Sequence, residues 1–213
     1  MADKSRLVIS AAIEGTVDEI VVRRLLENAG DFDLSGVYGR KGKDWIRQKI
    51  NDYNKAAQFF NWFVLVDLDL EYDCAPQLIS KWLPQPAPFM LFRVAVRSVE
   101  SWLLADREHI ARFLGVREKD VPANPESLYH PKESMIHLVR KSKRSEIRQD
   151  MLPRDGSGLK IGPAYSSRLV EFINHQSRGW RLDIAAKNSD SLNRCLNGIK
   201  NWRKKCKKSP SPD

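Results

Sequence analysis

The stretch Asn61–Leu68, NWFVLVDL, decides the fold expected for this chain. Its apolar residues follow one another almost without interruption, which is typical of a strand buried on both faces of a parallel sheet. Runs of the same kind occur at Arg6–Ile13 and Phe89–Val96. The segments between these runs carry apolar residues at helical spacing. Strands that alternate with helices predict an α/β fold with a mainly parallel sheet and helices on both faces.

The other elements follow from spacing and capping residues. A helix should run from the Glu14-Gly15 turn to Gly30, where the glycine is its cap, and a short strand should include Val37 and Tyr38. Further helices are predicted at residues 43–57, around Leu78 and Trp82, at 99–104, from Pro163 at its first position onward, and along Leu192–Trp202. Residues 118–162 give no clear assignment. We expect a core over residues 1–117, a mostly helical C-terminal extension packed on it over 118–203, and a flexible basic tail over 204–213.

The bulk composition limits the class of protein. The chain has 213 residues, enough for one α/β domain with a modest appendage. Its 36 Lys and Arg residues against 27 Asp and Glu give a net charge of +9, which favours a polyanion such as nucleic acid as partner, because each neutralised phosphate releases a counterion. The alternative is a basic surface that serves only solubility.

The cysteines and the apolar runs indicate a compartment. Three cysteines without a CxxC pair fit neither a disulfide framework nor a zinc knuckle, so a reducing environment is expected. No stretch approaches the roughly 20 apolar residues that a membrane-spanning helix needs. We therefore expect a cytoplasmic protein without a membrane segment.

Acidic residues follow three of the predicted strands. Glu14 and Asp18 lie in EGTVDE, Asp67 and Asp69 lie in VLVDLDL, and Ser98 and Glu100 lie in VRSVESW. Open α/β sheets bind ligands beyond the carboxyl ends of their strands. Residues i and i+2 of a strand lie about 6.6 Å apart on one side of it. The three clusters are therefore expected to gather at one edge of the sheet.

A group of carboxylates at one edge needs a counter-charge. Two carboxylates at the strand separation repel each other by about 2 to 3 kcal/mol at an effective dielectric constant of 20. A divalent cation removes this cost, and ligation by oxygen alone suits Mg²⁺ or Mn²⁺ rather than zinc. The alternative is that these acids only cap helices and solvate strand ends.

The order of these motifs resembles a known family. Glu-Gly after the first strand and Asp-x-Asp at the end of a later strand are similar to the Toprim signature of topoisomerases, bacterial primases and OLD-type nucleases. The phrases VESWLLAD, GPAYSSRLVEFI and DSLNRCL resemble the DUF4276 family of small bacterial Toprim proteins. The resemblance covers roughly Leu7–Trp202, with the Toprim part in about the first half. It implies a Toprim-like, Rossmann-like core.

The resemblance also implies roles for single residues. Glu14 would be a metal ligand and acid/base group, and Asp67 and Asp69 would be metal ligands. OLD-type nucleases bind a second metal, for which Asp18, Ser98 and Glu100 stand at matching places. Those enzymes also use a lysine beyond the core. Lys160 in GLKIGPAY is the first candidate for it, and Lys143 and Arg154 are alternatives.

Basic and aromatic residues add a second candidate surface. Arg40, Lys41 and Lys43 flank two glycines in GRKGK, which lacks the order of a P-loop but suits phosphate contacts. A plain solvated turn is an equal alternative. The four histidines show no metal-binding spacing and are expected at the surface or the core edge. Most tryptophans are expected in the core, with Trp102 as a candidate for base stacking.

Taken together, the sequence predicts a Mg²⁺- or Mn²⁺-dependent endonuclease that cuts DNA or RNA. The resemblance implies that such proteins work beside an ATPase, for example as the effector of an anti-phage system. This chain has no Walker motif, so any ATP dependence would come from a partner. The alternatives are a non-catalytic Toprim-like module that binds nucleic acid or protein, and a phosphotransfer enzyme such as a primase or phosphatase.

Overall fold

The computed structural model describes residues 6–207 of the chain. These residues form two compact units. The first contains the described parts of residues 1–95 and 193–213, and the second is Val96–Leu192. The division lies elsewhere than the boundary expected after residue 117, because the segment that follows the last strand packs within the helical second unit.

The first unit is built on a four-stranded parallel sheet in the order β2-β1-β3-β4. Its strands are β1 (Leu7–Ile13), β2 (Phe32–Gly39), β3 (Asn61–Asp67) and β4 (Met90–Ala95). The central part of β3, Trp62–Val66, is buried throughout. This burial explains the unbroken apolar run and confirms the predicted α/β fold with a parallel sheet. The second strand is longer than the sequence indicated.

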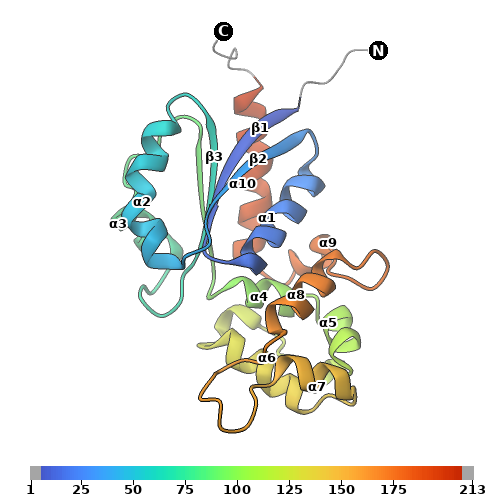
Figure 1. Ribbon diagram of the computed structural model, residues 1–213. Helices are drawn as coiled ribbons and strands as arrows, with labels where there is room; N and C mark the ends of the chain where they lie inside the picture. Colours follow the sequence, from blue (N-terminus) through green and yellow to red (C-terminus); the bar gives the residue numbers. More distant parts are fainter. Residues whose placement is uncertain (1–5, 208–213) are drawn as a thin grey trace. The chain divides into compact units, whose positions relative to one another are not determined.

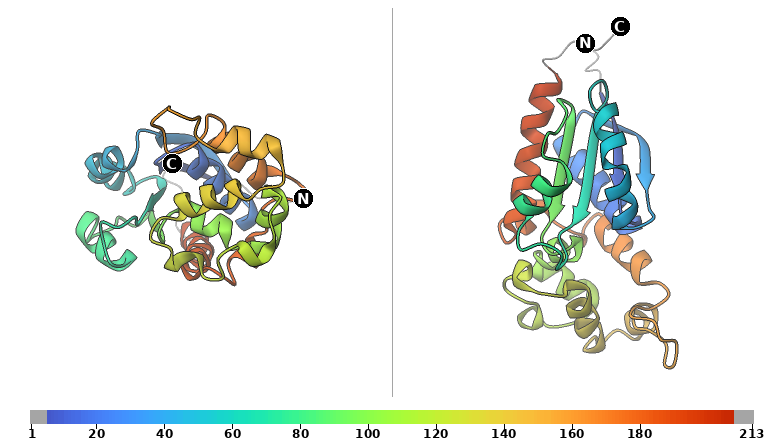
Figure 2. Two further views of the ribbon diagram at one scale, coloured as in Figure 1. Left: turned by 90° about the horizontal axis from the view of Figure 1, so that it is seen from below. Right: turned by 90° about the vertical axis from the view of Figure 1, so that its left-hand side faces the viewer.

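Helices cover both faces of this sheet. They are α1 (Thr16–Ala29), α2 (Lys43–Ala56), α3 (Ala75–Trp82) and α10 (Asp190–Cys206), the last of which lies in the first unit from Asn193 onward. Trp82 of α3 stacks on Phe92, whereas Gly198 of α10 lies against the neighbouring Arg93. Adjacent residues of a strand face opposite sides, so α3 and α10 cover opposite faces. Figure 1 shows α1 on the side of α10, and the right-hand view of Figure 2 looks at the sheet from the side of α2 and α3.

The strand order places a topological switch point between β1 and β3. From β1 the chain passes through α1 to β2, whereas from β3 it passes through α3 to β4, on the opposite side of the β1–β3 pair. The connections that leave the carboxyl ends of β1 and β3 therefore diverge. In open α/β sheets the crevice at such a point is the usual place for a ligand. The fold thus singles out the residues that follow Ile13 and Val66.

The second unit consists of short helices. These are α4 (Val99–Leu104), α5 (Arg107–Leu114), α6 (Pro131–Arg140), α7 (Ser145–Met151), α8 (Tyr165–Asn174) and α9 (Leu182–Ala185), with 3₁₀ turns at Glu118–Asp120 and Pro125–Ser127. Its core includes the fully buried side chains of Trp102, Tyr165, Phe172 and Trp180. The region 118–162, which the sequence left unassigned, thus contains two helices, α6 and α7.

Two predicted boundaries were wrong. The helix expected to begin at Pro163 begins at Tyr165, because Pro163 lies in a turn closed by a hydrogen bond from Tyr165 N to Gly162 O (3.2 Å). The tail expected from residue 204 is helical to Cys206, which is buried, and Lys207 Nζ lies 2.8 Å from Asp31 Oδ2. The rest of the predicted tail, residues 208–213, lies outside the described residues.

Among residues 6–207, no helix combines the length and the apolar character needed to cross a bilayer.

Candidate functional site

The first two residues of the site meet at the carboxyl ends of β1 and β3. Glu14 directly follows β1, and Asp67 is the last residue of β3. The two strands are parallel neighbours, so both ends lie at the same edge of the sheet. The backbone N–H of Asp67 donates a hydrogen bond to Glu14 Oε1 at 2.8 Å. The predicted convergence of these residues is therefore observed.

Asp69 adds a third carboxylate just beyond β3. Its φ angle of 53° lies in the left-handed region, which aspartate tolerates better than most residues. This backbone conformation turns the chain away from the strand direction. The Asp69 side chain is 54% exposed and forms an ion pair with Lys43 (Nζ to Oδ2, 3.1 Å).

Lys43 lies within this cluster, which the sequence analysis did not foresee. Its side chain is only 13% exposed. Besides Asp69, its ammonium donates to the carbonyl oxygen of Leu68 at 3.1 Å and lies 3.5 Å from Glu71 Oε2. Lys43 was expected to bind phosphate from its place in GRKGK, but no local pattern indicates a partner 26 residues away.

Asp18 is a fourth acid in the same region. It lies in the first turn of α1 and is 7% exposed. Its Oδ2 would be 3.4 Å from a Cβ on Gly15, so the Glu14-Gly15 turn passes directly beside this carboxylate. The charges of Asp18 and Asp69 both act on Glu14. Glu14 thus lies near the charges of Asp18 and Asp69 and accepts a hydrogen bond from the backbone of Asp67.

The surroundings of Glu14 favour its protonated form. Burial is the main cause that raises its pKa, and the hydrogen bond from Asp67 N opposes it. The negative charges of Asp18 and Asp69 raise the pKa further, and the positive charge of Lys43 lowers it. The net result is a pKa of about 7, compared with 4.5 for an ordinary glutamate. Glu14 can therefore hold or release a proton near neutral pH.

The donor set suits a hard divalent cation in its chemistry. Carboxylate oxygens at one sheet edge are the ligands of Mg²⁺ and Mn²⁺. The arrangement is nevertheless not preformed: among residues 6–207, no three Asp, Glu, His or Cys side chains are placed to hold one ion. Two features account for this, since Glu14 accepts a hydrogen bond from a backbone amide and Asp69 is paired with Lys43. Binding of a cation by Asp69 would require the ammonium of Lys43 to leave that carboxylate.

The basic loop at Gly39–Gly42 lies beside the same edge. Gly39 has a φ of 93°, and a Cβ there would be 2.3 Å from the carbonyl oxygen of Ile13, so only glycine allows this close approach. The amides of Arg40 and Gly42 donate to the carbonyl oxygens of Ile13 (2.9 Å) and Glu14 (3.1 Å). These two amides therefore hold the loop against β1 rather than point toward a phosphate.

The charged side chains of this loop differ in their contacts. Arg40 Nε donates to Glu19 Oε2 at 2.7 Å, and the Arg40 and Arg23 guanidinium groups together lower the pKa of Glu19 against the effect of its burial. Lys41 instead lies over the ring of Trp45, with Nζ 4.4 Å from its centroid. Of the three predicted phosphate contacts, Arg40 and Lys43 are thus paired with carboxylates. The predicted nucleic-acid contacts stay predictions.

Ser98 and Glu100 belong to the second unit. Glu100 is 3% exposed. It accepts hydrogen bonds from Ser98 Oγ (2.7 Å) and from the Tyr165 hydroxyl (3.3 Å), and Lys132 Nζ lies 3.6 Å from its Oε1. Burial, followed by the charge of Glu100, raises the pKa of Tyr165 well above its usual value. The predicted role of Ser98 and Glu100 as ligands of a second metal stays a prediction, and the sequence did not indicate the contacts of Glu100 with Tyr165 and Lys132.

Lys160, the first candidate for a catalytic lysine, is exposed in the loop between α7 and α8. The alternatives Lys143 and Arg154 are also exposed. Lys132, on α6, is the lysine that the structure places near a carboxylate of the predicted second metal site. The spacing between Glu100 and Lys132 follows no recognisable motif, so the sequence offered no basis for this pairing.

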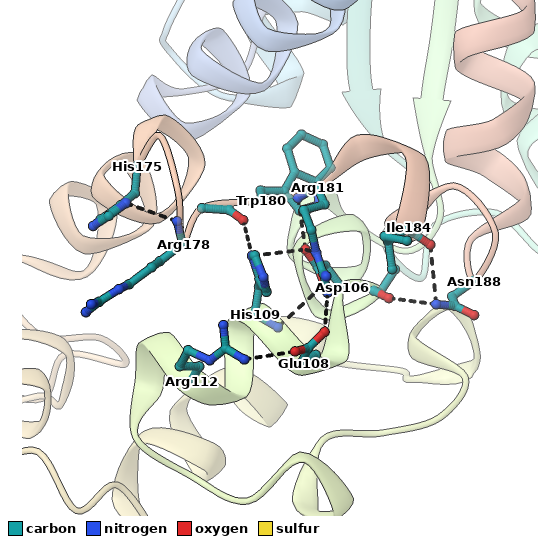
Figure 3. Close-up of polar contacts among 12 residues, drawn as sticks. Asp106, Glu108, His109, Arg112, His175, Arg178, Trp180, Arg181, Ile184 and Asn188 are labelled. Atoms are coloured by element: carbon teal, nitrogen blue, oxygen red, sulfur yellow. Dashed lines mark hydrogen bonds and ion pairs between the residues drawn. The ribbon is translucent and has the colours of Figure 1, made fainter.

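Figure 3 shows an ionic network of the second unit that the sequence did not reveal. Asp106 is fully buried and caps α5. It accepts hydrogen bonds from Arg181 N (2.9 Å), Nε (3.1 Å) and NH2 (2.6 Å). The pairing raises the pKa of Arg181. The buried ring of His109 lies beside this pair, with Nδ1 2.7 Å from the carbonyl oxygen of Gly179. This network joins α5 to the segment before α9.

The remaining histidines are exposed, as expected from their spacing. His130 and His137 line an open pocket of about 380 Å³ on α6, together with Asp120 and Glu133, and His175 follows α8. Trp102 does not fit its predicted role in base stacking. It is completely buried, and its Nε1 donates to Ser191 Oγ at 2.7 Å. Its complete burial makes it a core residue.

The chain was compared with family models, with curated proteins and with solved structures, and none of the three comparisons gave a match. The functional interpretation therefore depends on the site itself.

Proposed function

We propose that the chain is a Mg²⁺- or Mn²⁺-dependent nuclease that hydrolyses phosphodiester bonds in DNA or RNA. The observation that carries the proposal is the gathering of Glu14, Asp67 and Asp69 at the switch point of a parallel sheet. The charges of Asp18 and Asp69 act unfavourably on that of Glu14, and a bound cation would offset this repulsion. The resemblance to Toprim nucleases supports the same reading.

The proposal gives each acid a role. Glu14, Asp67 and Asp69 would hold the cation, which when bound acidifies water and offsets the charge of the reacting phosphate. Glu14 is also suited to hold a proton during the reaction, because its pKa is about 7. Asp18, Ser98 and Glu100 are proposed as ligands of a second cation. Lys160 is proposed to act on the phosphate, and Lys132 joins it as a candidate through its contact with Glu100.

The substrate class follows from charge. The net charge of +9 attracts a polyanion, and Lys41 is exposed beside the acidic edge. Arg40 and Lys43 would contribute after their carboxylate partners change. An ATPase partner and a role in anti-phage defence, both implied by the resemblance, remain part of the proposal. The experiment below therefore includes reactions with and without such a partner.

The test is cleavage by the purified full chain, alone and with an ATPase encoded beside it. Supercoiled plasmid, single-stranded DNA and RNA are incubated with Mg²⁺, Mn²⁺ or EDTA. We expect cleavage with either cation and none in EDTA. Asp67→Asn and Glu14→Gln should lose cleavage but keep nucleic-acid binding. Asp73→Asn is the matched control, because Asp73 is an exposed acid in the segment that follows the site. Undiminished cleavage by the Asp67→Asn, Glu14→Gln double variant would refute the proposal.

A second function has a specific observation in its favour. Lys43 already balances Asp69, and no three metal-ligating side chains of residues 6–207 are arranged for one ion. These facts suit a non-catalytic module that binds nucleic acid or protein through the same edge. Mn²⁺ titration separates the two functions. The nuclease should bind the ion through Asp67, whereas the module should bind nucleic acid equally well in EDTA.

A further inference from the structure

The ammonium of Lys43 lies among oxygen atoms of the segment after β3. Lysine side chains usually extend into water, yet that of Lys43 is only 13% exposed. Its Nζ contacts three oxygens of the segment after β3: Leu68 O and Asp69 Oδ2, both at 3.1 Å, and Glu71 Oε2 at 3.5 Å. The ammonium thus has an oxygen environment of the kind that a metal ion would require.

Aromatic and basic neighbours limit where this side chain can go. The Trp82 ring lies on one side, with its centroid 5.9 Å from Nζ, and the Arg47 guanidinium lies 5.7 Å from the same ring. Arg47 also holds Glu71, with NH1 2.9 Å from Oε1. Glu71 is therefore shared between two cations, whereas Asp69 is the closer carboxylate partner of Lys43. A change at Asp69 would remove a main restraint on the ammonium.

An ammonium and a divalent cation cannot share the Asp69 carboxylate at contact distance without strong repulsion. Two like charges about 4 Å apart repel by several kcal/mol at the dielectric constants of a protein surface. Asp69 must therefore exchange one cation for the other. An ammonium that leaves Asp69 can move only as far as the lysine side chain reaches from the first residue of α2.

We propose that Lys43 is a positioning residue for a phosphate group. Its ammonium pairs with Asp69 when no metal is bound and becomes available to the phosphate when a divalent cation binds the Asp69 carboxylate. The inference rests on the proposed function, since it assigns the phosphate of the same substrate to this lysine. It predicts that Lys43 opposes metal binding and that it supports polyanion binding only when metal is present. A lysine that served only to fix the turn after β3 would show neither effect.

The first measurement is Mn²⁺ affinity by calorimetry. Lys43→Met removes the charge but keeps much of the side-chain length. We expect the variant to bind Mn²⁺ about tenfold more tightly than the unchanged protein, because the competing cation is gone. Lys41→Met is the matched control, since Lys41 lies over Trp45 in the same loop. It should shift Mn²⁺ affinity much less. Far-UV circular dichroism and urea unfolding show that each variant is folded.

The second measurement is the affinity for a short DNA oligonucleotide in Mn²⁺ and in EDTA, with its integrity checked on a gel. Lys43→Met should weaken binding by about fivefold in Mn²⁺, the effect of about one lost phosphate contact, and leave it unchanged in EDTA. Lys41→Met should weaken binding equally in both conditions. Mn²⁺ affinity that is unchanged or lower in Lys43→Met would overturn the competition. An equal loss of DNA affinity in both conditions would overturn the role in phosphate positioning.

These outcomes are distinct from those of the nuclease test. If no substrate is cut but both shifts occur, the nuclease proposal fails and the role of Lys43 stands. If cleavage occurs and depends on Asp67, but Lys43→Met changes neither affinity, the nuclease proposal stands and this inference fails. If neither the unchanged protein nor Lys43→Met binds Mn²⁺, both the nuclease proposal and the inference about Lys43 are refuted.

Discussion

Two carboxylates, the fully buried Asp106 of the second unit and the half-buried Glu14 of the first, differ in how their charge is balanced. Asp106 of the second unit is fully buried, and Arg181 donates three hydrogen bonds to it. Glu14 of the first unit accepts a hydrogen bond from one backbone amide and lies near the like charges of Asp18 and Asp69. A satisfied buried pair stabilises a fold, whereas a crowded acidic cluster costs stability unless a ligand compensates for it. The comparison indicates a structural role for Asp106, whereas the like charges around Glu14 are the feature that a cation would relieve in the proposed function.

The largest effect should come from breaking the satisfied pair. Asp106→Ala leaves the Arg181 guanidinium without its main partner and removes the cap of α5. We expect a loss of about 3 to 5 kcal/mol in the free energy of unfolding, as for other broken buried pairs. Urea denaturation followed by tryptophan fluorescence measures it. Glu108→Gln is the control, because Glu108 contacts the same guanidinium from the surface and should change stability far less. A similar loss in both variants would show that burial does not decide the effect.

Removing the charge of Glu14 is expected to increase the free energy of unfolding, in contrast to Asp106→Ala. Its pKa is about 7 in the folded protein and near 4.5 in the unfolded chain, so the folded state binds this proton more tightly. The associated stability is fully present below pH 4.5 and is lost as pH rises through 7. Glu14→Gln keeps an acceptor for Asp67 N but removes the charge. In EDTA it should raise the free energy of unfolding by about 2 to 3 kcal/mol at pH 8.

The same variant should give little gain at pH 4.5, where Glu14 is already protonated. Unfolding curves at several pH values between 4.5 and 8 provide the measurement. A gain that is equal at both ends of this range would mean that packing rather than charge is responsible. Together with Asp106→Ala, this pair of results would separate a stabilising carboxylate from a functional one.

The sequence predicted much of the first unit and little of the second, for a physical reason. Buried parallel strands need long apolar runs. The run NWFVLVDL and the similar runs at Arg6–Ile13 and Phe89–Val96 therefore identified the sheet and the edge where Glu14 and Asp67 meet. The second unit is held by contacts between distant short helices. Asp106 and Arg181 are 75 residues apart, and no periodic pattern connects them.

The roles of single charged residues were the hardest to predict. Lys43 was assigned to phosphate binding from its place in GRKGK. Its ion pair with Asp69 arises only because the carboxyl end of β3 and the first residue of α2 lie at the same edge of the sheet. Lys132 meets Glu100 in the same way, through the fold. Residue type and spacing thus indicated where acids gather, but their counter-charges depended on tertiary contacts.

A smaller effect is expected for the basic loop in EDTA. Arg40 and Lys43 are paired with Glu19 and Asp69, so Lys41 is the residue of this loop best placed to reach a phosphate. Lys41→Ala should lower the magnitude of the slope of log affinity against log salt by about 0.9, the value for one phosphate contact on duplex DNA. Fluorescence anisotropy across a salt series measures it. An unchanged slope would show that Lys41 contacts no phosphate.

The smallest effect concerns an ion pair at the surface of the first unit. Asp31 accepts hydrogen bonds from Lys207 and Arg203 at the end of α10, and these bonds lower its pKa to about 2. A lowered pKa means that the stabilisation is present above pH 3.8 and is lost as pH falls through 2. Asp31→Asn should therefore free the last turn of α10 without unfolding the sheet. Amide hydrogen exchange should become faster at residues 203–207 and stay unchanged in β3.

Asp33→Asn, a substitution of an exposed acid on β2, is the control and should alter neither region. Faster exchange throughout α10 in Asp31→Asn would contradict the local effect and would make this exposed pair as important for the fold as the buried one at Asp106.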